Sequence, residues 1–580
     1  MRRSIWLGLV SVLVIALAAL LVVGCGDDTT ATTAGSGTDT SAGPPADSGE
    51  PVMGGVAKIG KLGAAAFFGF PPNVRGPDQW WEGLFLESLF NPTGEIDEYE
   101  PALAESWELL PDKSAYVFYL REGVKFTDGT DFNAQACKFC WDLNLGAAPA
   151  GGPPPGPPPE GAAPEGAPPA GGAPEGAPPA GGPPPGGPPG APPDFAFVDS
   201  IEVIDDYTVQ VNLEEWSNQV LSFIGRKSWA VFSPTAYEEN GAEWMNTNPV
   251  GTGAWMIKEY IPEQSMVLEK NPDYWGKDDQ GRQLPYMDGI EIQMFADPTA
   301  LTIALQAGQL DGTDQVALVG ASQLQEDSDF VLDSFGGPVQ MIQMNTTAPD
   351  SVWSDLRMRE ALEYAIDKEG LAESVGFGFP SAVYSIIHSV KDVADPGTTP
   401  RIYDPEEAKR LMADAGYTSV DCTINYDQTR GEPAEAAALQ ANLAAVGINA
   451  KLNGMSTAAF SPISVKPPAG NDLTLQGLRG GSPNVLQGAI EMYGKGTIYF
   501  PAFSPPEEFY TLMAKAQTYD SLTDALPDIA QMEKIAYEDA QVIPITMAAF
   551  ISATGPRLKN MEWFFGNTPT PWFKEAWLVD

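Results

Sequence analysis

Residues 403–452, YDPEEAKRLMADAGYTSVDCTINYDQTRGEPAEAAALQANLAAVGINAKL, contain the pattern that decides the fold class. Asp404 is a typical N-cap residue, Pro405 suits the first helical position, and Glu407 stands three residues after the cap, as in a capping box. Gly416 marks the end of this predicted helix. Its apolar face has helical spacing and consists of Ala408, Leu411, Met412 and Ala415.

Helices and strands alternate on both sides of this segment. The spacing of the apolar residues in 358–366 predicts another amphipathic helix. A third helix runs towards Val446 and stops at Gly447, and residues 448–452 then alternate as in a strand. Interleaved helices and strands predict an α/β fold in which helices cover a sheet.

The N-terminal half shows strand patterns. Residues 116–120, YVFYL, alternate as a strand does, and Asp128-Gly129 marks a turn. Residues 201–203 and 209–213 alternate on either side of Asp205-Asp206. This arrangement predicts a β-hairpin.

Length and charge narrow the function. A chain of 580 residues is too long for one ordinary core and predicts two or three domains. The formal net charge of -45, without a cluster of Lys and Arg, argues against nucleic acid as a partner. His388 is the only histidine, so it is the one candidate base for a histidine-dependent catalytic site. A single imidazole is also a poor basis for a metal site, and we expect no metal or other cofactor.

The N-terminus predicts export. Arg2 and Arg3 precede an apolar run, residues 4–24, that carries no charge. The run is long enough to span a bilayer, so an uncleaved anchor is the alternative to a cleaved signal peptide. Both alternatives place the bulk of the chain outside the cytoplasm.

The end of the apolar run resembles a bacterial lipobox. Residues 21–25 are LVVGC, with a small residue before Cys25. The resemblance implies that residues 1–24 are a lipoprotein signal peptide and that Cys25 is lipidated. Residues 25–53, rich in Gly, Ser, Thr, Asp and Ala, are then a flexible tether to the membrane.

Residues 146–193 differ in kind from the rest of the chain. They consist of Gly, Ala, Pro and three Glu, and they hold 20 of the 54 prolines. Since no core can form from these residues, we expect a long disordered loop between two ordered segments. Two interpretations stay open: a tolerated insertion made by repeat slippage, which we favour, and a segment that binds a partner or spans a cell wall.

Short motifs follow one another in a characteristic order along the chain. They are Pro101–Trp107, Leu120–Phe126, Asp128–Thr130, Asn248–Gly253, Asn271–Gly276, Leu305–Asp311, Arg359–Leu362, Ala365–Lys368 and Tyr403–Pro405. The ordered series, downstream of a lipobox, resembles the family 5 extracellular solute-binding proteins of ABC transporters. That family includes oligopeptide-, dipeptide- and nickel-binding proteins. The resemblance covers residues 54–580 apart from the proline-rich insertion.

The resemblance implies a two-lobed, periplasmic-binding-protein-like α/β fold of type II. Residues 54–319 and 552–580 would form lobe I, which carries an extra subdomain that includes the insertion 146–193. Residues 320–551 would form lobe II. The two lobes are expected to close on a ligand about a hinge.

The resemblance also places the ligand between residues 64–70 of lobe I and residues 477–483 of lobe II. Peptide-binding members hold the ligand backbone like an added strand and pair its ammonium with an aspartate of the late segment. Here that segment is GLRGGSP, without an aspartate. A buried ammonium without a carboxylate partner is disfavoured, whereas Arg479 would attract an oxyanion. A structural ion pair of Arg479 is an equal alternative.

Nine residues are the candidate ligand-binding residues. The aromatic ones could stack on a sugar ring or an apolar side chain, although core packing is the alternative for at least half of the aromatic cluster. Asn345 resembles a strand end that lines the cleft in relatives. The candidates are Phe67, Phe68, Phe70, Trp80, Asn345, Arg479, Gly480, Gly481 and Ser482.

Cys137 and Cys140 form a C-x-x-C pair outside any thioredoxin-like context. We interpret them as two packed cysteines, and a disulfide outside the cytoplasm is the alternative.

We therefore predict a lipid-anchored, monomeric solute-binding component of an ABC importer. It would not be an enzyme, and it would capture peptides or a related small solute and deliver them to a membrane permease. An oligosaccharide or anionic metabolite is the second hypothesis for the ligand. An acidic glycoside hydrolase is the third hypothesis, and a purely structural envelope lipoprotein the last.

Overall fold

The computed structural model describes most of the chain from residue 49 onward. The described residues are 49–74, 78–146, 197–225, 229–385, 398–428, 432–478, 484–495, 505–563 and 571–579. Among them, no helix is long and apolar enough to cross a membrane. Cys25, His388 and the candidate residues 479–482 lie outside the described residues.

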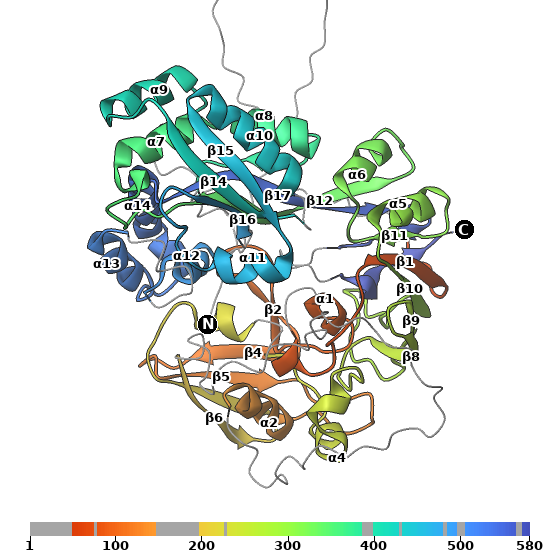
Figure 1. Cartoon of the computed structure of the whole chain (residues 1–580). Helices are drawn as coiled ribbons and strands as arrows, with labels where there is room; N and C mark the ends of the chain where they lie inside the picture. Colours follow the sequence, from red (N-terminus) through yellow and green to blue (C-terminus); the bar gives the residue numbers. More distant parts are fainter. Residues whose placement is uncertain are drawn as a thin grey trace, which may run out of the picture. The chain divides into compact units, whose positions relative to one another are not determined.

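The main sheet has eleven strands (Figure 1). They are β1 (Val56–Leu62), β8 (Trp255–Ile261), β9 (Ser265–Lys270), β10 (Gly289–Phe295), β11 (Gly312–Thr313), β12 (Val331–Gln343), β13 (Ser381–Ala382), β14 (Val420–Asp427), β15 (Ile448–Met455), β16 (Leu473–Leu478) and β17 (Val542–Thr554). Ten follow one another as β15-β14-β16-β12-β17-β11-β1-β10-β9-β8, and β13 pairs with β17. Strand β1 runs parallel to both β10 and β11, so these three strands end at the same edge of the sheet.

A separate four-stranded antiparallel sheet, in the order β4-β5-β7-β6, forms a subdomain in the N-terminal half. Its strands are β4 (Ala104–Leu109), β5 (Ala115–Leu120), β6 (Val198–Asp205) and β7 (Thr208–Leu213). Helix α2 (Ala134–Asn144) packs on β6. The proline-rich insertion therefore connects α2 and β6, two elements of this subdomain.

The remaining elements of the N-terminal half and the C-terminal stretch are short. They are α1 (Gln79–Glu82), β2 (Phe90–Pro92), β3 (Tyr99–Pro101), α3 (Val220–Ile224), α4 (Pro234–Met245), α5 (Pro298–Gln306), α6 (Leu318–Leu324), β18 (Leu558–Lys559) and β19 (Trp577–Leu578). One hydrophobic cluster joins residues 57–294 to residues 558–578.

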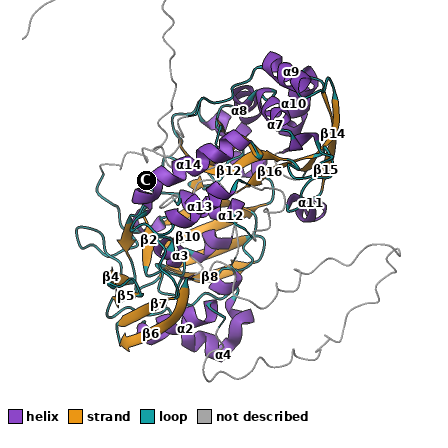
Figure 2. Ribbon diagram, turned by 90° about the vertical axis from the view of Figure 1, so that its left-hand side faces the viewer, coloured by secondary structure: helices purple, strands orange, loops and turns teal. Residues whose placement is uncertain are grey.

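Helices cover both faces of the sheet in the C-terminal half, as Figure 2 shows for β12 and β16. Ile342 of β12 packs with the first group of helices, and its neighbour Met341 packs with the second, because successive strand residues point to opposite faces. The first group is α7 (Leu356–Tyr364), α8 (Lys368–Gly376), α9 (Pro405–Asp414) and α10 (Glu432–Ala445). The second group is α12 (Val485–Tyr493), α13 (Glu507–Ala516) and α14 (Leu522–Asp539). Helix α11 (Thr457–Ser464) contacts β14.

The long strands β12 and β17 link the two parts of the main sheet. They pair antiparallel from Val331 opposite Thr554 to Gln343 opposite Val542. Their register shifts at Gly336–Val339, where the sequence is GGPV. Glycine and proline interrupt a regular ladder, so this point is the natural place for bending.

The predicted lobe boundaries remain predictions. A division between residues 319 and 320 falls inside α6, which packs on α5 and on the end of β17. This packing favours a lobe boundary in the middle of β12 and of β17, where the chain would pass from one lobe to the other.

The element predictions agree with the structure. Asp404 accepts hydrogen bonds from the N–H groups of Glu406 and Glu407 at 3.1 and 3.0 Å, and thereby caps α9. The capping-box role of Glu407 is wrong, because its carboxylate binds Arg410 at 2.6 Å while the N–H of Asp404 donates to Tyr364. The predicted helices around residues 358–366 and before Gly447, the strand at 448–452 and the hairpin at 201–213 are all present.

Two of the family-like motifs, at residues 248–253 and 271–276, have structural roles in the N-terminal half. A Cβ atom at Gly251 or Gly253 would lie 2.2 or 2.6 Å from the carbonyl oxygen of Phe85, so only glycine permits this approach. Trp275 and Tyr274 donate to the carboxylate of Glu87 at 2.8 and 2.9 Å. These contacts support the interpretation that the motifs identify a scaffold rather than a ligand.

Candidate functional site

The carboxyl ends of β1, β10 and β11 meet at one edge of the main sheet. Ligands of open α/β sheets commonly bind outside the carboxyl ends of parallel strands. Residues 63–70, which follow β1, and Asp314, which follows β11, lie at this edge. The early ligand segment predicted from the sequence therefore begins at a favourable position.

Hydrogen bonds within the N-terminal half hold the backbone of this early segment. The Asp78 carboxylate accepts hydrogen bonds from the N–H groups of Ala66, at 3.1 Å, and Phe67, and burial raises the pKa of Asp78 despite them. The N–H groups of Phe68 and Gly69 donate to the carbonyl of Asn246. The N–H groups of residues 66 to 69 therefore all have partners within the N-terminal half.

Three of the four aromatic candidates are core residues. Phe68, Phe70 and Trp80 are 0%, 6% and 2% exposed, whereas Phe67 is 37% exposed. Phe68 packs edge-on against Tyr260, with ring centroids 5.5 Å apart. The alternative of core packing therefore describes these three side chains in this conformation, and Phe67 is the aromatic candidate that a ligand can reach.

Trp80 belongs to a buried charged cluster that sequence reasoning missed. Nζ of Lys61 lies 2.7 Å from Oδ2 of Asp314 and 4.9 Å from the centroid of the Trp80 ring. Both charged side chains are 8% exposed. Oδ1 of Asp314 and Nε1 of Trp80 are buried without a hydrogen-bond partner in the described part of the chain. These polar atoms lie at the same sheet edge as the early segment.

The sequence contains only a weak indication of this cluster. Lys61 interrupts the apolar pattern of its strand, and Asp314 is one of many acidic residues. Their partnership joins positions 253 residues apart, so only the parallel pairing of β1 with β11 brings them together.

Asn345 organises the loop that follows β12. Its Nδ2 donates to the carbonyl of Pro468 at 3.1 Å, and its Oδ1 accepts from the N–H groups of Thr347 and Ala348 at 3.3 and 3.1 Å. A role at the ligand stays a prediction. The four candidates of the late segment, Arg479 to Ser482, lie outside the described residues.

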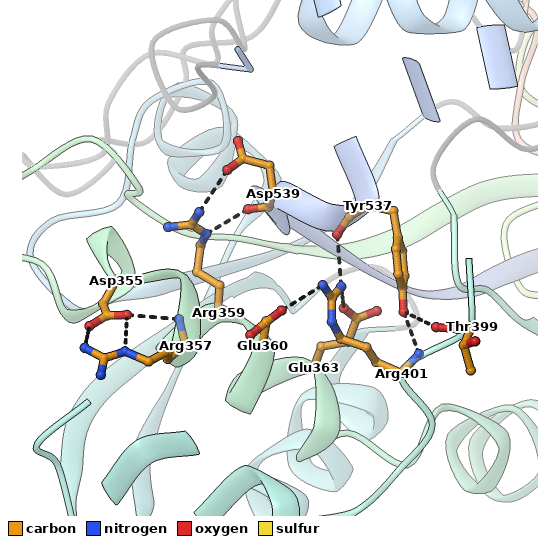
Figure 3. Close-up of polar contacts among 9 residues, drawn as sticks. All are labelled: Asp355, Arg357, Arg359, Glu360, Glu363, Thr399, Arg401, Tyr537 and Asp539. Carbon is orange, nitrogen blue, oxygen red and sulfur yellow. Dashed lines mark hydrogen bonds and ion pairs between the residues drawn. The ribbon is translucent and has the colours of Figure 1, made fainter. Parts of the chain in front are cut away.

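A second polar cluster joins α7, α14 and the segment before α9 (Figure 3). Arg401 pairs with Glu363 and Glu360 at 3.0 Å each and donates to the carbonyl of Tyr537 at 2.9 Å. Lys368 is also paired with Glu363, at 2.9 Å.

Arg359 lies on the same helix, α7, and belongs to a family-like motif. It donates to the carbonyl of Asp539 at 2.9 Å and pairs with its carboxylate at 3.1 Å. An arginine at the carboxyl end of α14 complements the helix dipole, so this motif residue is explained by packing.

A small cavity lies beside this cluster. It is lined by Glu363, Tyr384, Ser385, Glu533, Ala536, Tyr537, Val542 and Pro544. Because two cations already neutralise Glu363, we assign no ligand to this cavity.

The remaining chemistry-bearing residues are structural. Cys137 and Cys140 are buried free thiols on α2, and the peptide group of Phe232 contacts Sγ of Cys140 at 3.2 Å. Burial raises the pKa of both thiols. The interpretation as two packed cysteines is therefore confirmed. In the described ranges, no group of three or more His, Cys, Asp or Glu side chains could hold a metal ion.

Comparison with solved structures defines the class of protein. The fold matches DppA, a periplasmic binding protein from Helicobacter pylori solved with the peptide STSA, with a TM-score of 0.68, 19% identity, and coverage of 91% of this chain and 99% of that one. It matches NikA from Brucella suis, solved with Fe(III)-EDTA, with a TM-score of 0.73, 19% identity, and coverage of 90% and 100%. The protein has the two-lobed fold of periplasmic binding proteins, and the expected fold class is confirmed.

Sequence comparison then gives the family. The model of the bacterial extracellular solute-binding proteins, family 5, matches residues 98–519, and the chain belongs to this family. A Brucella ovis protein, named as a candidate peptide-binding protein of an ABC transporter, is 25% identical over 418 residues, which cover 70% of each chain. The glutathione-binding protein GsiB of Shigella flexneri is 26% identical over 374 residues, 64% of each chain.

The general function follows from the family. The chain is a solute-binding component of an ABC importer. Proteins of this kind act outside the cytoplasm, and the family is one of binding proteins rather than enzymes.

Proposed function

We propose that the protein captures peptides between its two lobes and delivers them to a membrane permease, without catalysing a reaction. The observation that carries the proposal is family membership together with a hydrogen-bonded early segment at the carboxyl edge of β1. Relatives named for peptides, glutathione and heme show that the family scaffold serves several ligands. Peptide is the class that recurs among them.

The early segment limits how a peptide could pair with it. Since the N–H groups of residues 66–69 are used inside the lobe, a ligand strand would have to pair mainly with backbone carbonyls. Peptide N–H groups are suitable donors, and such pairing is indifferent to the ligand's side chains. Phe67 would add an apolar surface beside that strand.

The late segment governs which end of the ligand is recognised. Residues 477–483 contain Arg479 and no aspartate. The usual carboxylate partner of a peptide ammonium is therefore missing, while Arg479 suits a carboxylate. An oligosaccharide or an anionic metabolite remains the second candidate for this reason.

We also propose that Cys25 carries the lipid anchor and that the protein acts as a monomer at the outer face of the cell membrane. The lipobox at residues 21–25 and the polar composition of residues 26–48 support this arrangement. A single lipid-bearing residue and a flexible tether would keep the binding lobes near the permease.

Native mass spectrometry of the full chain, purified gently from membranes without added ligand, tests the ligand class. Peptide capture predicts a ladder of bound masses that differ by amino-acid residues. One non-peptide mass that disappears in an Arg479→Ala variant would replace the peptide proposal with a sugar or anion receptor.

Phe67→Ala tests the early segment. If Phe67 contacts the ligand, the bound fraction in the same measurement falls several-fold. The matched control is Phe377→Ala, which removes another exposed phenylalanine, 51% exposed, that follows α8. Equal bound fractions for the two variants would remove Phe67 from the site.

A further inference from the structure

Loops of lobe I contact the corner between α13 and α14 of lobe II. The contacting residues are Ile96, Asp97, Lys113 and Asn218, and the corner consists of residues 516–523. We call this set the corner contact. Its residues belong to different lobes wherever the boundary along β12 and β17 is drawn.

Asp97 binds the N-terminus of α14. Its Oδ1 accepts a hydrogen bond from the N–H of Leu522 at 3.0 Å, and its Oδ2 accepts from the N–H and Oγ1 of Thr523 at 2.8 and 2.9 Å. Ser521 caps the same helix from within by accepting from the N–H of Asp524. A carboxylate at this end satisfies open N–H groups and complements the positive end of the helix dipole.

Asn218 binds the other side of the corner. Its Nδ2 donates to the carbonyl of Ala516 at 2.8 Å, where α13 ends, and to that of Ser521 at 3.3 Å. Its backbone N–H donates to the carbonyl of Gln517 at 3.1 Å. Gln219 donates to Oδ1 of Asn218 at 2.8 Å and so fixes the orientation of the amide. The Asp97 carboxylate thus accepts hydrogen bonds at the start of α14, and Asn218 donates hydrogen bonds at the end of α13.

Two further side chains complete the contact. Ile96 packs against the hydrophobic cluster of α12, α13 and α14. Lys113 pairs with Asp520 in the corner, and its Nζ lies 4.8 Å from the centroid of the Trp216 ring. The ion pair is exposed, so solvent and salt can weaken it.

The position of the corner makes it sensitive to lobe motion. Helix α14 has 18 residues and leads directly into β17, one of the two strands that link the lobes. At 1.5 Å per residue, the corner lies about 27 Å along the helix from that strand. A small rotation at the strand therefore becomes a large displacement at the corner.

We propose that the corner contact is a latch, which forms when the lobes close and breaks when they separate, and which thereby sets the population of the closed state. The latch consists of a few hydrogen bonds, one exposed ion pair and one apolar side chain. Each is weak enough to break without unfolding either lobe. The inference rests on the proposed function, because it assumes that the lobes move to admit a ligand.

Distances between spin labels in the ligand-free full chain test the latch. One label replaces exposed Glu202 of β6 in lobe I, and the other replaces exposed Glu406 of α9 in lobe II. The double variant Asp97→Gly/Asn218→Ala removes the side-chain hydrogen bonds of these two residues to the corner. It leaves the backbone bond from residue 218 to Gln517 and the Lys113–Asp520 pair in place. Glycine suits the positive φ of 59° at residue 97. We expect a population with a longer distance between the labels. If the parent chain already has such a population, we expect its fraction to increase in the double variant.

The matched control is Asp297→Gly. Asp297 caps α5 by accepting from the N–H of Ala300 at 2.7 Å, within lobe I. Its loss weakens a helix cap without touching the corner contact, so the distance distribution should not change. An identical distribution in the parent, the double variant and this control would overturn the latch.

A reversible lock gives an independent measurement. Asp97→Cys/Thr523→Cys places two thiols where the native side chains already touch. Oxidation should leave only the shorter distance, and reduction should restore the parent distribution. A longer-distance population that persists after complete oxidation would contradict the proposal.

These distances are measured without ligand, so a failure of the peptide assignment appears only in the mass spectra. A latch that fails the test would leave the solute-binding function unaffected.

Discussion

At the residue scale, the buried pair of Lys61 and Asp314 gives a sharp stability prediction. Asp314→Ala leaves the ammonium of Lys61 buried without its carboxylate, and we expect a loss of about 3 kcal/mol in the free energy of unfolding. Guanidinium denaturation followed by circular dichroism measures it. Lys61→Met/Asp314→Leu should recover most of the loss, because it removes both charges.

An exposed pair on α9 is the control for this prediction. Lys409 and Glu406 lie 2.8 Å apart, with 47% and 82% of their side chains exposed. Glu406→Ala should cost less than about 1 kcal/mol, since water screens the pair. Similar losses for Asp314→Ala and Glu406→Ala would show that the cluster at β1 is not a buried charge pair in solution.

Glu562 predicts a dependence of stability on pH. Burial, followed by the nearby charges of Glu100, Asp333 and Glu575, raises its pKa to about 7. A raised pKa means that the folded state favours the protonated form. Its stabilising contribution is complete below the ordinary pKa near 4.5 and is lost as the pH rises through about 7.

Glu562→Gln should therefore raise the stability at pH 8 and flatten the pH profile between pH 5 and 8. The gain should be at most about 1 kcal/mol, because the side chain is partly exposed and water screens its charge. Thermal unfolding at several pH values measures it. Glu508→Gln, on the exposed start of α13, is the control, and an equal gain there would reject the assignment.

At the element scale, two glycines that follow helices offer a matched comparison. Gly416 after α9 and Gly447 after α10 both have φ of 92°. An added Cβ would meet nothing within 4 Å at Gly416, but it would lie 2.9 Å from the carbonyl oxygen of Thr418 at Gly447. Alanine should cost about 1 kcal/mol at Gly416, from backbone strain alone, and clearly more at Gly447. Urea denaturation of the two variants decides it, and equal costs would contradict the structural difference.

Helix α9 shows how much of an element can be predicted from local sequence. Asp404, Pro405 and Gly416 predicted the bounds of α9 because capping and termination depend on neighbouring residues. The partner of Glu407 could not be predicted in the same way. Arg410 is one turn further along the helix, and its guanidinium competes with the backbone for the carboxylate.

At the scale of the whole molecule, the proline-rich insertion should be dispensable for folding. Helix α2 and strand β6 flank it and contact each other, for example through Nζ of Lys138 and the carbonyl of Ile201 at 2.8 Å. We consider replacing residues 147–196 by a Gly/Ser linker of about ten residues. Stability should stay unchanged or rise by about 1 kcal/mol, because closing a shorter loop costs less conformational entropy. Thermal unfolding checks this, and a loss of cooperative unfolding would assign the insertion a structural role.

In the candidate site, too, the sequence predicts the segment but not the exposure of its side chains. The family resemblance predicts residues 64–70 as the early ligand segment, but burial separates Phe67 from Phe68 and Phe70, three residues of one chemical type within four positions. Their exposure depends on Tyr237, Tyr260 and Phe85, which are distant in sequence. No local pattern encodes such contacts.

The sequence by itself determined the elements, the α/β class and the family. Those depend on helical and strand periodicity, on caps and on an ordered set of motifs, all of which are local properties of the chain. Only the tertiary structure decided that Lys61 pairs with Asp314 and that Arg359 binds the end of α14. It also decided that Asp97 and Asn218 bind the α13–α14 corner. These pairs join residues between 180 and 426 positions apart, and strand pairing and lobe packing, rather than neighbouring residues, bring them together.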